Sequence, residues 1–243
     1  INTLTFDAVA TSAVTINGGT LTIDPSSSST GITLENGAAA ATINSAVVMG
    51  SAQTWTNNSA TSLLTINGNL SNGGSLLTKA GVGAVTAAGV ISGAGGLALT
   101  AGTFSINQQA NTFTGNITVD GASTVLSIVG SSTGTYTTSN PLGNAAAGGT
   151  NFKTVTLTNG GTFALASQNF NVNVITSTNV GAGMVFNIGT GGGRFDVASG
   201  STFTVDDGTT TGTATTAYQL QGSGGLTKAG DGTLILRQQN AYS

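Results

Sequence analysis

The stretch Leu220–Leu236, LQGSGGLTKAGDGTLIL, decides the fold. Two earlier segments align with it, Leu70–Thr86 (LSNGGSLLTKAGVGAVT) and Val90–Ile106 (VISGAGGLALTAGTFSI). All three contain a glycine-rich turn, a strand with leucine, a second glycine turn and a strand with alternating apolar residues. Such a repeated strand–turn unit predicts that the chain coils, with each strand pairing with its equivalent one coil further on.

Short segments with alternating apolar and polar residues also run through the rest of the chain. Examples are Leu4–Phe6, Ile117–Val119 and Phe203–Val205, and the Asn-Gly, Gly-Gly and Asp-Gly pairs near such segments favour tight turns with positive φ. No stretch has the spacing of apolar residues that an amphipathic helix requires. The pattern predicts an all-β chain, a single parallel β-helix (β-solenoid) that is continuous over residues 1–243.

The expected size follows from the length of 243 residues. At ~20–25 residues per coil the chain makes roughly ten coils, or rungs, and strands ~4.8 Å apart give a rod of roughly 50 Å. A β-sandwich is the alternative, but it needs longer strands and more large core residues than one Trp, three Tyr and nine Phe supply. Small Ala, Ser and Thr side chains suit narrow coils, and Asn side chains are expected to stack as amide ladders.

One segment departs from the alternation. Residues 130–150 (GSSTGTYTTSNPLGNAAAGGT) contain Pro141 and are predicted to form a loop or an excursion from the rod. A short helical turn is expected within this segment at Leu142–Ala147. Asp24–Ser29 is predicted to be a smaller loop.

Composition restricts the function classes. Charged residues make up 5% of the chain, against roughly 25% in typical soluble proteins. The formal net charge is −3 and the five basic residues are scattered, so a nucleic-acid partner is not expected. The absence of cysteine fits a secreted protein that takes its stability from β-ladders. Because the first residue is Ile1 and not Met, the chain is expected to be a processed product or a portion of a longer one.

Few residues are available for chemistry. With no His and no Cys, His-based triads, thiol nucleophiles and most zinc sites are excluded, and neither a cofactor nor a metal is predicted. The adjacent pair Asp206-Asp207 precedes Gly208 and is predicted to be a polar turn, because neighbours on a strand point to opposite faces. Carboxylates from different coils could still meet at the separation that glycosidases use. The eight carboxylates are Asp7, Asp24, Glu35, Asp120, Asp196, Asp206, Asp207 and Asp231.

Three glycine-rich segments are near-matches to binding motifs. Gly191–Asp196 (GGGRFD) comes close to a calcium nonapeptide, but Arg194 replaces its fourth-position Gly and the motif stands alone. Gly93–Gly96 and Gly222–Gly225 are not followed by the helix or the Gly-Lys-Ser/Thr that a phosphate loop requires. All three are predicted to be turns, the first leading into a strand with Arg194 and Asp196 pointing to solvent.

Lys79 and Lys228 occupy the same position in their repeats. The recurrence predicts either a solvated ladder edge or a contact that both copies share, and no catalytic role. Trp55 is the one tryptophan. We expect it to fill the core or cap the coil locally, although exposed aromatic residues on a β-rod can stack on sugars.

The final stretch, Gly222–Ser243 (GSGGLTKAGDGTLILRQQNAYS), resembles the autotransporter-associated β-strand repeat, whose general form is GxGGLxKxGxGTLxLxxxNxYxG. An earlier copy spans Gly93–Val119, and a degenerate one covers Asn72–Thr86. The resemblance implies a right-handed parallel β-helix, secretion and display at a bacterial cell surface, and it implies no activity. The earlier copy departs from the usual Thr-Lys and Gly pattern at Ala98, Leu99 and Ala101.

These features lead to one functional hypothesis and two alternatives. The chain is expected to be a non-enzymatic, extracellular structural protein that builds a bacterial surface fibre or filament by head-to-tail stacking, with or without an adhesive role. Its partner would be a second copy of itself or covalently attached neighbouring repeats, with a cell surface or a polysaccharide as a further contact. The alternatives are a β-helix that binds or cleaves polysaccharide, and a spacer segment of a giant cell-surface adhesin.

The two ends of the predicted rod carry the expected assembly edge. Natural solenoids usually cap their ends, and two uncapped, compatible ends form a heterologous interface that grows into an open filament. The internal repeat continues into Asn116–Val119, whereas the final copy is expected to stop before this strand, which Asn2–Phe6 of the next molecule, or more chain, would supply. The predicted edge residues are Asn2, Leu4 and Phe6 at the start and Leu234, Leu236 and Tyr242 at the end.

Overall fold

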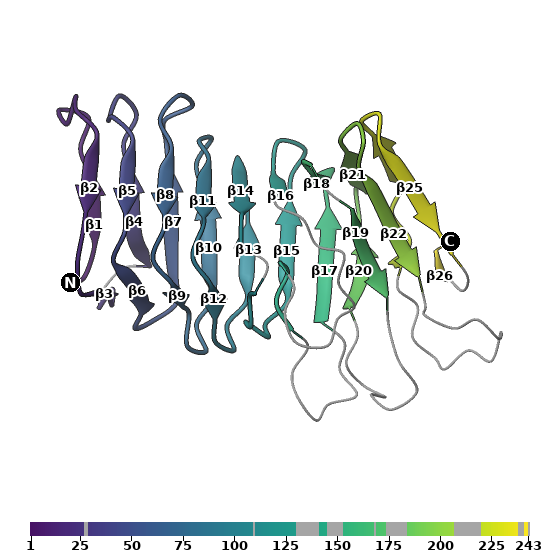
Figure 1. Ribbon diagram of the computed structural model, residues 1–243, viewed down its shortest axis with the longest axis horizontal. Helices are drawn as coiled ribbons and strands as arrows, with labels where there is room; N and C mark the ends of the chain where they lie inside the picture. The colour runs from purple at the N-terminus through teal and green to yellow at the C-terminus, as the bar shows by residue number, and fades with distance from the viewer. Residues whose placement is uncertain are drawn as a thin grey trace.

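The computed structural model describes residues 1–26, 29–108, 110–129, 141–144, 153–167, 169–173, 184–206, 220–237 and 241–242. In these ranges the chain forms short strands and no helix, and hence none long and apolar enough to cross a membrane. Every strand pairing is parallel, and the strands stack along one rod (Figure 1). The prediction of an all-β parallel β-helix is therefore confirmed.

The strands form four parallel sheets, which we call sheets A to D. Sheet A has ten strands in the order β1 (Leu4–Phe6), β4 (Thr30–Leu34), β7 (Gln53–Asn57), β10 (Leu77–Ala80), β13 (Leu97–Leu99), β15 (Ile117–Asp120), β17 (Lys153–Thr158), β20 (Met184–Ile188), β23 (Leu220–Gly222) and β26 (Ala241–Tyr242). Sheet B has nine strands in the order β2 (Val14–Ile16), β5 (Ala41–Ile43), β8 (Leu64–Ile66), β11 (Val85–Ala87), β14 (Thr103–Ile106), β16 (Val125–Ile128), β18 (Gly161–Leu165), β21 (Gly193–Val197) and β24 (Leu226–Ala229). Sheet C contains β3 (Thr20–Ile23), β6 (Ala46–Met49), β9 (Leu70–Ser71) and β12 (Ile91–Ser92), and sheet D contains β19 (Phe170–Asn173), β22 (Thr202–Asp206) and β25 (Thr233–Leu236).

Each coil passes through sheet A, then sheet B, then a third side. The third side belongs to sheet C near the N-terminus and to sheet D near the C-terminus. The ten strands of sheet A agree with the predicted number of rungs. Successive coils follow one another from the N-terminal to the C-terminal end of the rod, so the two termini lie far apart (Figure 1).

The register between coils keeps equivalent side chains in columns. Leu77 of β10 pairs with Leu97 of β13, which pairs with Ile117 of β15, so each of these coils takes 20 residues. All three side chains are buried, whereas Thr78, between two inward positions, is half-exposed. Because side chains alternate along a strand, this register turns every second residue into part of a continuous apolar core.

The core changes composition along the rod. Near the N-terminus it is mostly Ile, Leu and Val, with Trp55 as its largest member. Nearer the C-terminus five phenylalanines gather, with neighbouring ring centroids between 5.0 and 6.2 Å apart. Such aromatic pairs contribute ~0.5–1.5 kcal/mol each beyond the area they bury. The five residues are Phe163, Phe170, Phe186, Phe195 and Phe203.

An asparagine ladder runs along the corner that follows sheet B. The Nδ2 of Asn44 donates to the Oδ1 of Asn17 at 2.6 Å, and the Nδ2 of Asn67 donates to the Oδ1 of Asn44 at 2.8 Å. These three residues belong to successive coils, so the expected stacking of amide side chains is confirmed at this corner.

Part of the predicted excursion returns to the rod. The carbonyl oxygen of Pro141 accepts a hydrogen bond from the Nδ2 of Asn111 at 2.8 Å, and the backbone N–H of Asn144 donates to the carbonyl oxygen of Phe113 at 3.0 Å. Leu142 between them is fully buried. Pro141–Asn144 therefore cover the third side of a coil. Residues 130–140 and 145–150, which include half of the predicted helical turn, lie outside the described residues, and Leu142–Asn144 form no helix.

The three aligned repeats do not occupy the same sides of the coil. The two earlier copies stack directly on each other, because Lys79 pairs with Leu99 in sheet A and β11 pairs with β14 in sheet B. In the final copy Lys228 lies in sheet B, in register with Phe195. The repeat thus specifies a strand, a corner and a second strand. In the two earlier copies these strands lie in sheets A and B, whereas in the final copy they lie one side further along the coil, in sheets B and D.

Close backbone contact between coils makes Gly95 a sensitive position. A Cβ at residue 95 would overlap the carbonyl oxygen of Ser75 in the preceding coil, whereas a Cβ at Gly74 would meet no atom within 4 Å. We expect Gly95→Ala to lower the free energy of unfolding by ~1–3 kcal/mol, because the backbone must shift. Urea unfolding followed by circular dichroism measures the change, with Gly74→Ala as the control. Equal stability of the two variants would contradict the close stacking of coils.

Candidate functional site

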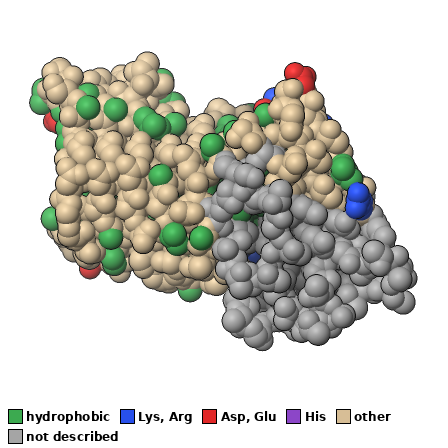
Figure 2. Space-filling model, in the orientation of Figure 1, with side chains coloured by type: hydrophobic (Ala, Val, Ile, Leu, Met, Phe, Trp, Pro, Cys, Tyr) green, Lys and Arg blue, Asp and Glu red, His purple; other side chains and the backbone are tan. Residues whose placement is uncertain are grey.

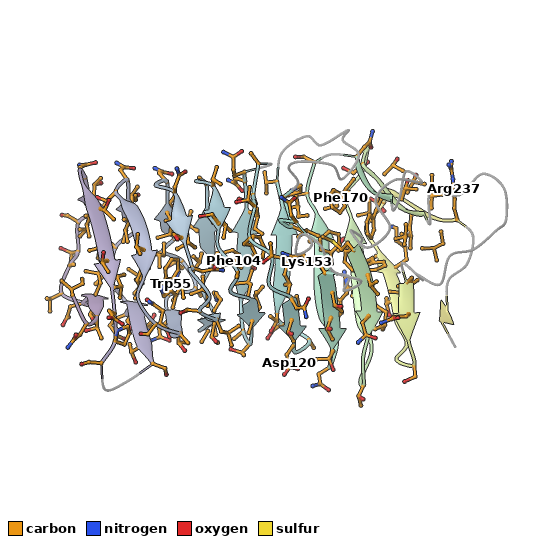
Figure 3. The ribbon with its side chains drawn as sticks, turned by 90° about the horizontal axis from the view of Figure 1, so that it is seen from below. Trp55, Phe104, Asp120, Lys153, Phe170 and Arg237 are labelled. Carbon is orange, nitrogen blue, oxygen red and sulfur yellow. The ribbon has the colours of Figure 1, made fainter. Side chains whose placement is uncertain are left out.

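The carboxylates that the structure describes are spread along the rod. In the described ranges, no three His, Cys, Asp or Glu side chains lie close enough together to hold a metal ion. Asp120, at the edge of the rod in Figure 3, accepts a hydrogen bond from the Nδ2 of Asn159 at 2.7 Å. Glu35 accepts one from Asn58 at 3.3 Å. Asp207 and the side chain of Asp206 lie outside the described part of the chain.

The near-match to a calcium motif forms an ordinary strand. Gly193–Val197 is β21, in which Phe195 is buried and Arg194 is exposed. The guanidinium of Arg194 pairs with the carboxylate of Asp196 at 3.2 Å on the outer face. The predicted turn into a strand, with both charged side chains on the solvent side, is confirmed. An exposed pair of this kind contributes about 0–1 kcal/mol to stability.

The two other glycine-rich segments form corners of the coil. Gly93 and Gly222 have φ values of 110° and 112°, and each corner leads directly into a strand, β13 or β24. Both segments therefore lack the helix that a phosphate loop needs, as predicted.

Trp55 fills the core, as the sequence analysis preferred. Its side chain is fully buried within the rod (Figure 3). Its Nε1–H donates to the Oε1 of Gln53 at 3.0 Å, and the Nε2 of Gln53 donates to the carbonyl oxygen of Ile23 in β3 at 3.0 Å. The indole is thus held inside and does not offer a surface on which a sugar could stack.

The prediction of a solvated edge is wrong for Lys79. This side chain is fully buried, and its Nζ donates to the carbonyl oxygens of Gly81 at 2.6 Å and Gly83 at 2.5 Å at its own corner. A third carbonyl comes from Ala101 in the next coil, at 2.8 Å. The apolar stem joins the core while three carbonyls satisfy the three N–H donors of the charged amine, which is why burial is tolerated.

Lys228 repeats part of this arrangement at the C-terminal end of the rod. Its Nζ donates to the carbonyl oxygens of Ala229 and Gly230, both at 2.7 Å. Gly230 and Gly81 each lie two residues after their lysine, so the other prediction, a contact shared by both copies, is confirmed. Unlike Lys79, Lys228 is exposed, because it lies in the last strand of sheet B.

Sequence reasoning missed a second buried lysine, Lys153. Its Nζ lies 3.4 Å from the centroid of the Phe113 ring and donates to the carbonyl oxygen of Phe113 at 2.9 Å. The same carbonyl accepts the N–H of Asn144, so the amine of Lys153 and the backbone of Asn144 share one acceptor. The sequence did contain a signal for this burial. Lys153 lies two and four residues before the inward Val155 and Leu157, so its side chain points to the same face of the strand.

Burial changes the proton affinity of both amines. Desolvation lowers the pKa of Lys153 from 10.5 to about 6 and that of Lys79 from 10.5 to about 8. The apolar core disfavours the charged form, and no carboxylate in the described ranges forms an ion pair with either amine. Both lysines point into the interior (Figure 3 shows Lys153), so their contacts serve the fold.

The first and last coils hold the predicted assembly-edge residues. Leu4 and Phe6 lie on β1, the first strand of sheet A, where Leu4 is half-buried and Phe6 is buried. Asn2 precedes this strand and is exposed. Both apolar residues occupy inward positions, in register with the buried Ile32 and Leu34 of the second coil.

At the other end of the rod, Leu234 and Leu236 lie on β25, the last strand of sheet D. Leu236 is 45% exposed although its partner Val205 is fully buried. Tyr242 lies on β26, in register with Gly222 of β23. Because the final copy is advanced by one side, Ala241–Tyr242 form β26 in sheet A, whereas the aligned residues Thr112 and Phe113 of the internal copy lie on the third side of their coil, bonded to Ile91. The expectation that the final copy stops before the equivalent of Asn116–Val119 stays a prediction.

The two lowered pKa values predict how stability depends on pH. Between pH 6 and pH 10.5 the unfolded Lys153 binds a proton that the folded form has lost, so the free energy of unfolding rises with pH across this window. The rise approaches ~1.4 kcal/mol per pH unit for one group. Between pH 6 and pH 8, below the window of Lys79, Lys153→Met should flatten the rise. Urea unfolding at constant salt measures the slope.

The exposed Lys228→Met is the matched control, and it should keep the slope of the unaltered protein. An equal slope in Lys153→Met and in the unaltered protein would contradict the buried, neutral state of Lys153.

Comparison with known proteins adds nothing to this geometry. No known protein family, curated protein or solved structure matches the chain. What is established is the fold, a parallel β-solenoid.

Proposed function

We propose that this chain is a structural, non-enzymatic β-solenoid module of an extracellular bacterial surface fibre, and that its rods stack head to tail. The observation that carries the proposal is the open edge of the described coils at each end. Among the described residues, the strands β1 and β2 pair with the coil that follows them, and β24, β25 and β26 pair with the coil that precedes them. β3 also pairs with the following coil, and on its outer edge Ile1 donates to the carbonyl oxygen of Thr22 and accepts from the N–H of Asp24. Unpaired backbone N–H and C=O groups of such edges are templates for a further strand.

The apolar core reaches both edges. Leu4, Val14 and Leu21 are partly buried at the N-terminal end, and Leu226 and Leu234 are partly buried at the C-terminal end. A further coil on either edge would remove these side chains from water, at about 25 cal/mol for each Å² of apolar surface buried. Because the two edges differ, their contact is heterologous, and repeated heterologous contacts make an open filament.

The walls of the rod support a structural role between the two ends. Charged side chains are scattered over the face shown in Figure 2 and do not gather into one patch. Outward positions are mostly small and polar, as in Thr78, Thr86 and Ser105. The extracellular bacterial setting rests on the resemblance of residues 222–243 to a surface-protein repeat and on the absence of cysteine.

Sedimentation velocity over a wide range of protein concentration tests the proposal. We expect the weight-average sedimentation coefficient to rise with concentration without reaching a closed oligomer, because a heterologous contact does not limit its own growth. Electron micrographs of the same samples should show unbranched fibres one rod wide.

A monomer that persists at the highest concentration would overturn self-assembly and would favour covalent neighbours, as in a spacer of a larger adhesin. Sheets or bundles of rods associated through their walls would also contradict stacking at the ends.

A further inference from the structure

We propose that Asn36 is a site of spontaneous chemical modification, at which the side-chain amide becomes a carboxylate in the folded protein. Asn36 is followed by Gly37 at the exposed corner between β4 and β5. The reaction needs only water and the protein's own backbone, so it takes place whether or not the rods assemble.

The chemistry belongs to the Asn-Gly pair. The backbone nitrogen of the glycine attacks the Cγ of the asparagine, so a C–N bond forms, the Cγ–Nδ2 bond breaks, and ammonia leaves with the proton of the attacking N–H. Water then opens the resulting five-membered succinimide at either of its two carbonyl carbons. One product is aspartate, and the other is isoaspartate, in which the main chain runs through the former side chain. Glycine favours the attack because it has no Cβ to hinder the approach of its nitrogen.

The chain contains this dipeptide in five different environments. A reacting asparagine has to turn its Cγ toward the next backbone nitrogen, so hydrogen bonds that hold the side chain or the glycine N–H oppose the reaction. The contacts of each pair therefore rank the five by reactivity. The pairs are Asn17-Gly18, Asn36-Gly37, Asn67-Gly68, Asn72-Gly73 and Asn159-Gly160.

Asn36 is the asparagine of the five whose side chain is not held. This side chain is exposed and forms no hydrogen bond within the described residues, and the same is true of the N–H of Gly37. The corner itself is well formed, because the N–H of Ala38 donates to the carbonyl oxygen of Glu35 at 3.1 Å. Both reacting groups are thus free within a turn that is closed around them.

Asn67 is the best comparison, since it is also exposed and also lies at a corner of the coil. The Nδ2 of Asn67 donates to the Oδ1 of Asn44 at 2.8 Å. The N–H of Gly68 donates to the carbonyl oxygen of Ile43 at 3.2 Å. The leaving group and the attacking nitrogen are both held by the preceding coil. Exposure does not distinguish Asn36 from Asn67, whereas hydrogen bonding does.

The other three asparagines are also held by a neighbouring coil. Asn72 is buried, and its Nδ2 and Oδ1 bond to the carbonyl oxygen and the N–H of Gly95 at 2.8 and 3.0 Å. The Nδ2 of Asn159 donates to the Oδ1 of Asp120 at 2.7 Å. The Oδ1 of Asn17 accepts a hydrogen bond at 2.6 Å as a member of the asparagine ladder. All three are expected to react more slowly than Asn36.

Modification of Asn36 changes this corner in two ways. Either product adds a carboxylate next to Glu35, and residues 1–78 contain no Lys or Arg that could pair with it. Isoaspartate also lengthens the main chain just before the buried Ala38, whose carbonyl oxygen accepts a hydrogen bond from the Oγ of Ser62 at 2.6 Å in the next coil. We therefore expect the modified corner to bind its neighbouring coils less tightly.

Peptide mapping by mass spectrometry tests the proposal. The folded protein is incubated in mildly alkaline buffer, which favours loss of the glycine N–H proton, and aspartate and isoaspartate are measured at each pair over time. Asn36 should react about tenfold faster than Asn67, because the hydrogen bonds that hold Asn67-Gly68 have to break first. No modification at Asn36, or equal rates at the two sites, would overturn the proposal.

Two controls separate the effect of structure from that of sequence. In urea, Asn36 and Asn67 should react at similar rates, because the hydrogen bonds are lost. In folded Asn44→Ala the ladder loses its middle member, so Asn67 should react about fivefold faster while Asn36 keeps its rate. An unchanged rate at Asn67 would show that its hydrogen bond is not the restraint and would overturn the ranking.

The effect on the fold has its own measurement. Asn36→Gln keeps a side-chain amide but would have to close a less favourable six-membered ring, so it should resist modification. Urea unfolding should show a lower midpoint after incubation of the unaltered protein and no change after incubation of Asn36→Gln. An unchanged midpoint in unaltered protein that mapping shows to be modified at Asn36 would contradict the expected weakening of the corner.

Discussion

Parallel backbone pairing between one coil and the next, in strict register, is the interaction on which the rest of the structure depends. It brings residues about 20 apart, such as Leu77 and Leu97, into one column. With only 5% charged residues and no disulfide, the chain has few other sources of order. The same pairing leaves an unpaired edge at each end of the described rod, so the property that builds the fold also supports the proposed assembly.

The corners of the coil create the exceptions to an apolar interior. Carbonyl oxygens turn inward where the chain bends, and buried amines satisfy them at Lys79 and Lys153. Burial in the apolar core disfavours the charged form of both amines, which lowers both pKa values. These lysines join the corner of one coil to its neighbour. Lys228, exposed in β24, makes the same contact with the carbonyl oxygen two residues later.

The fold could be predicted from patterns within short stretches of sequence, whereas the contacts of the buried lysines could not. The repeats Leu70–Thr86 and Val90–Ile106 stack on each other, at the aligned 20-residue spacing in β10 and β13 and at 19 residues in β11 and β14. Lys153 was missed because its partner Phe113 is 40 residues away across a segment with no periodicity. The side of the coil taken by Lys228 was also hidden, since identical strand–corner units fit sheet A or sheet B. Register over long separations depends on intervening lengths, which local patterns do not reveal.

The axial repeat of an assembled fibre tests the central claim most directly. Fibre diffraction or helical reconstruction by electron cryomicroscopy gives both the strand spacing and the rise for each copy. Head-to-tail stacking that continues the parallel ladder predicts strands ~4.8 Å apart across every junction and a rise for each copy that is a whole number of strand spacings. A rise that is not a whole number of strand spacings, or strands that do not lie across the fibre axis, would contradict it.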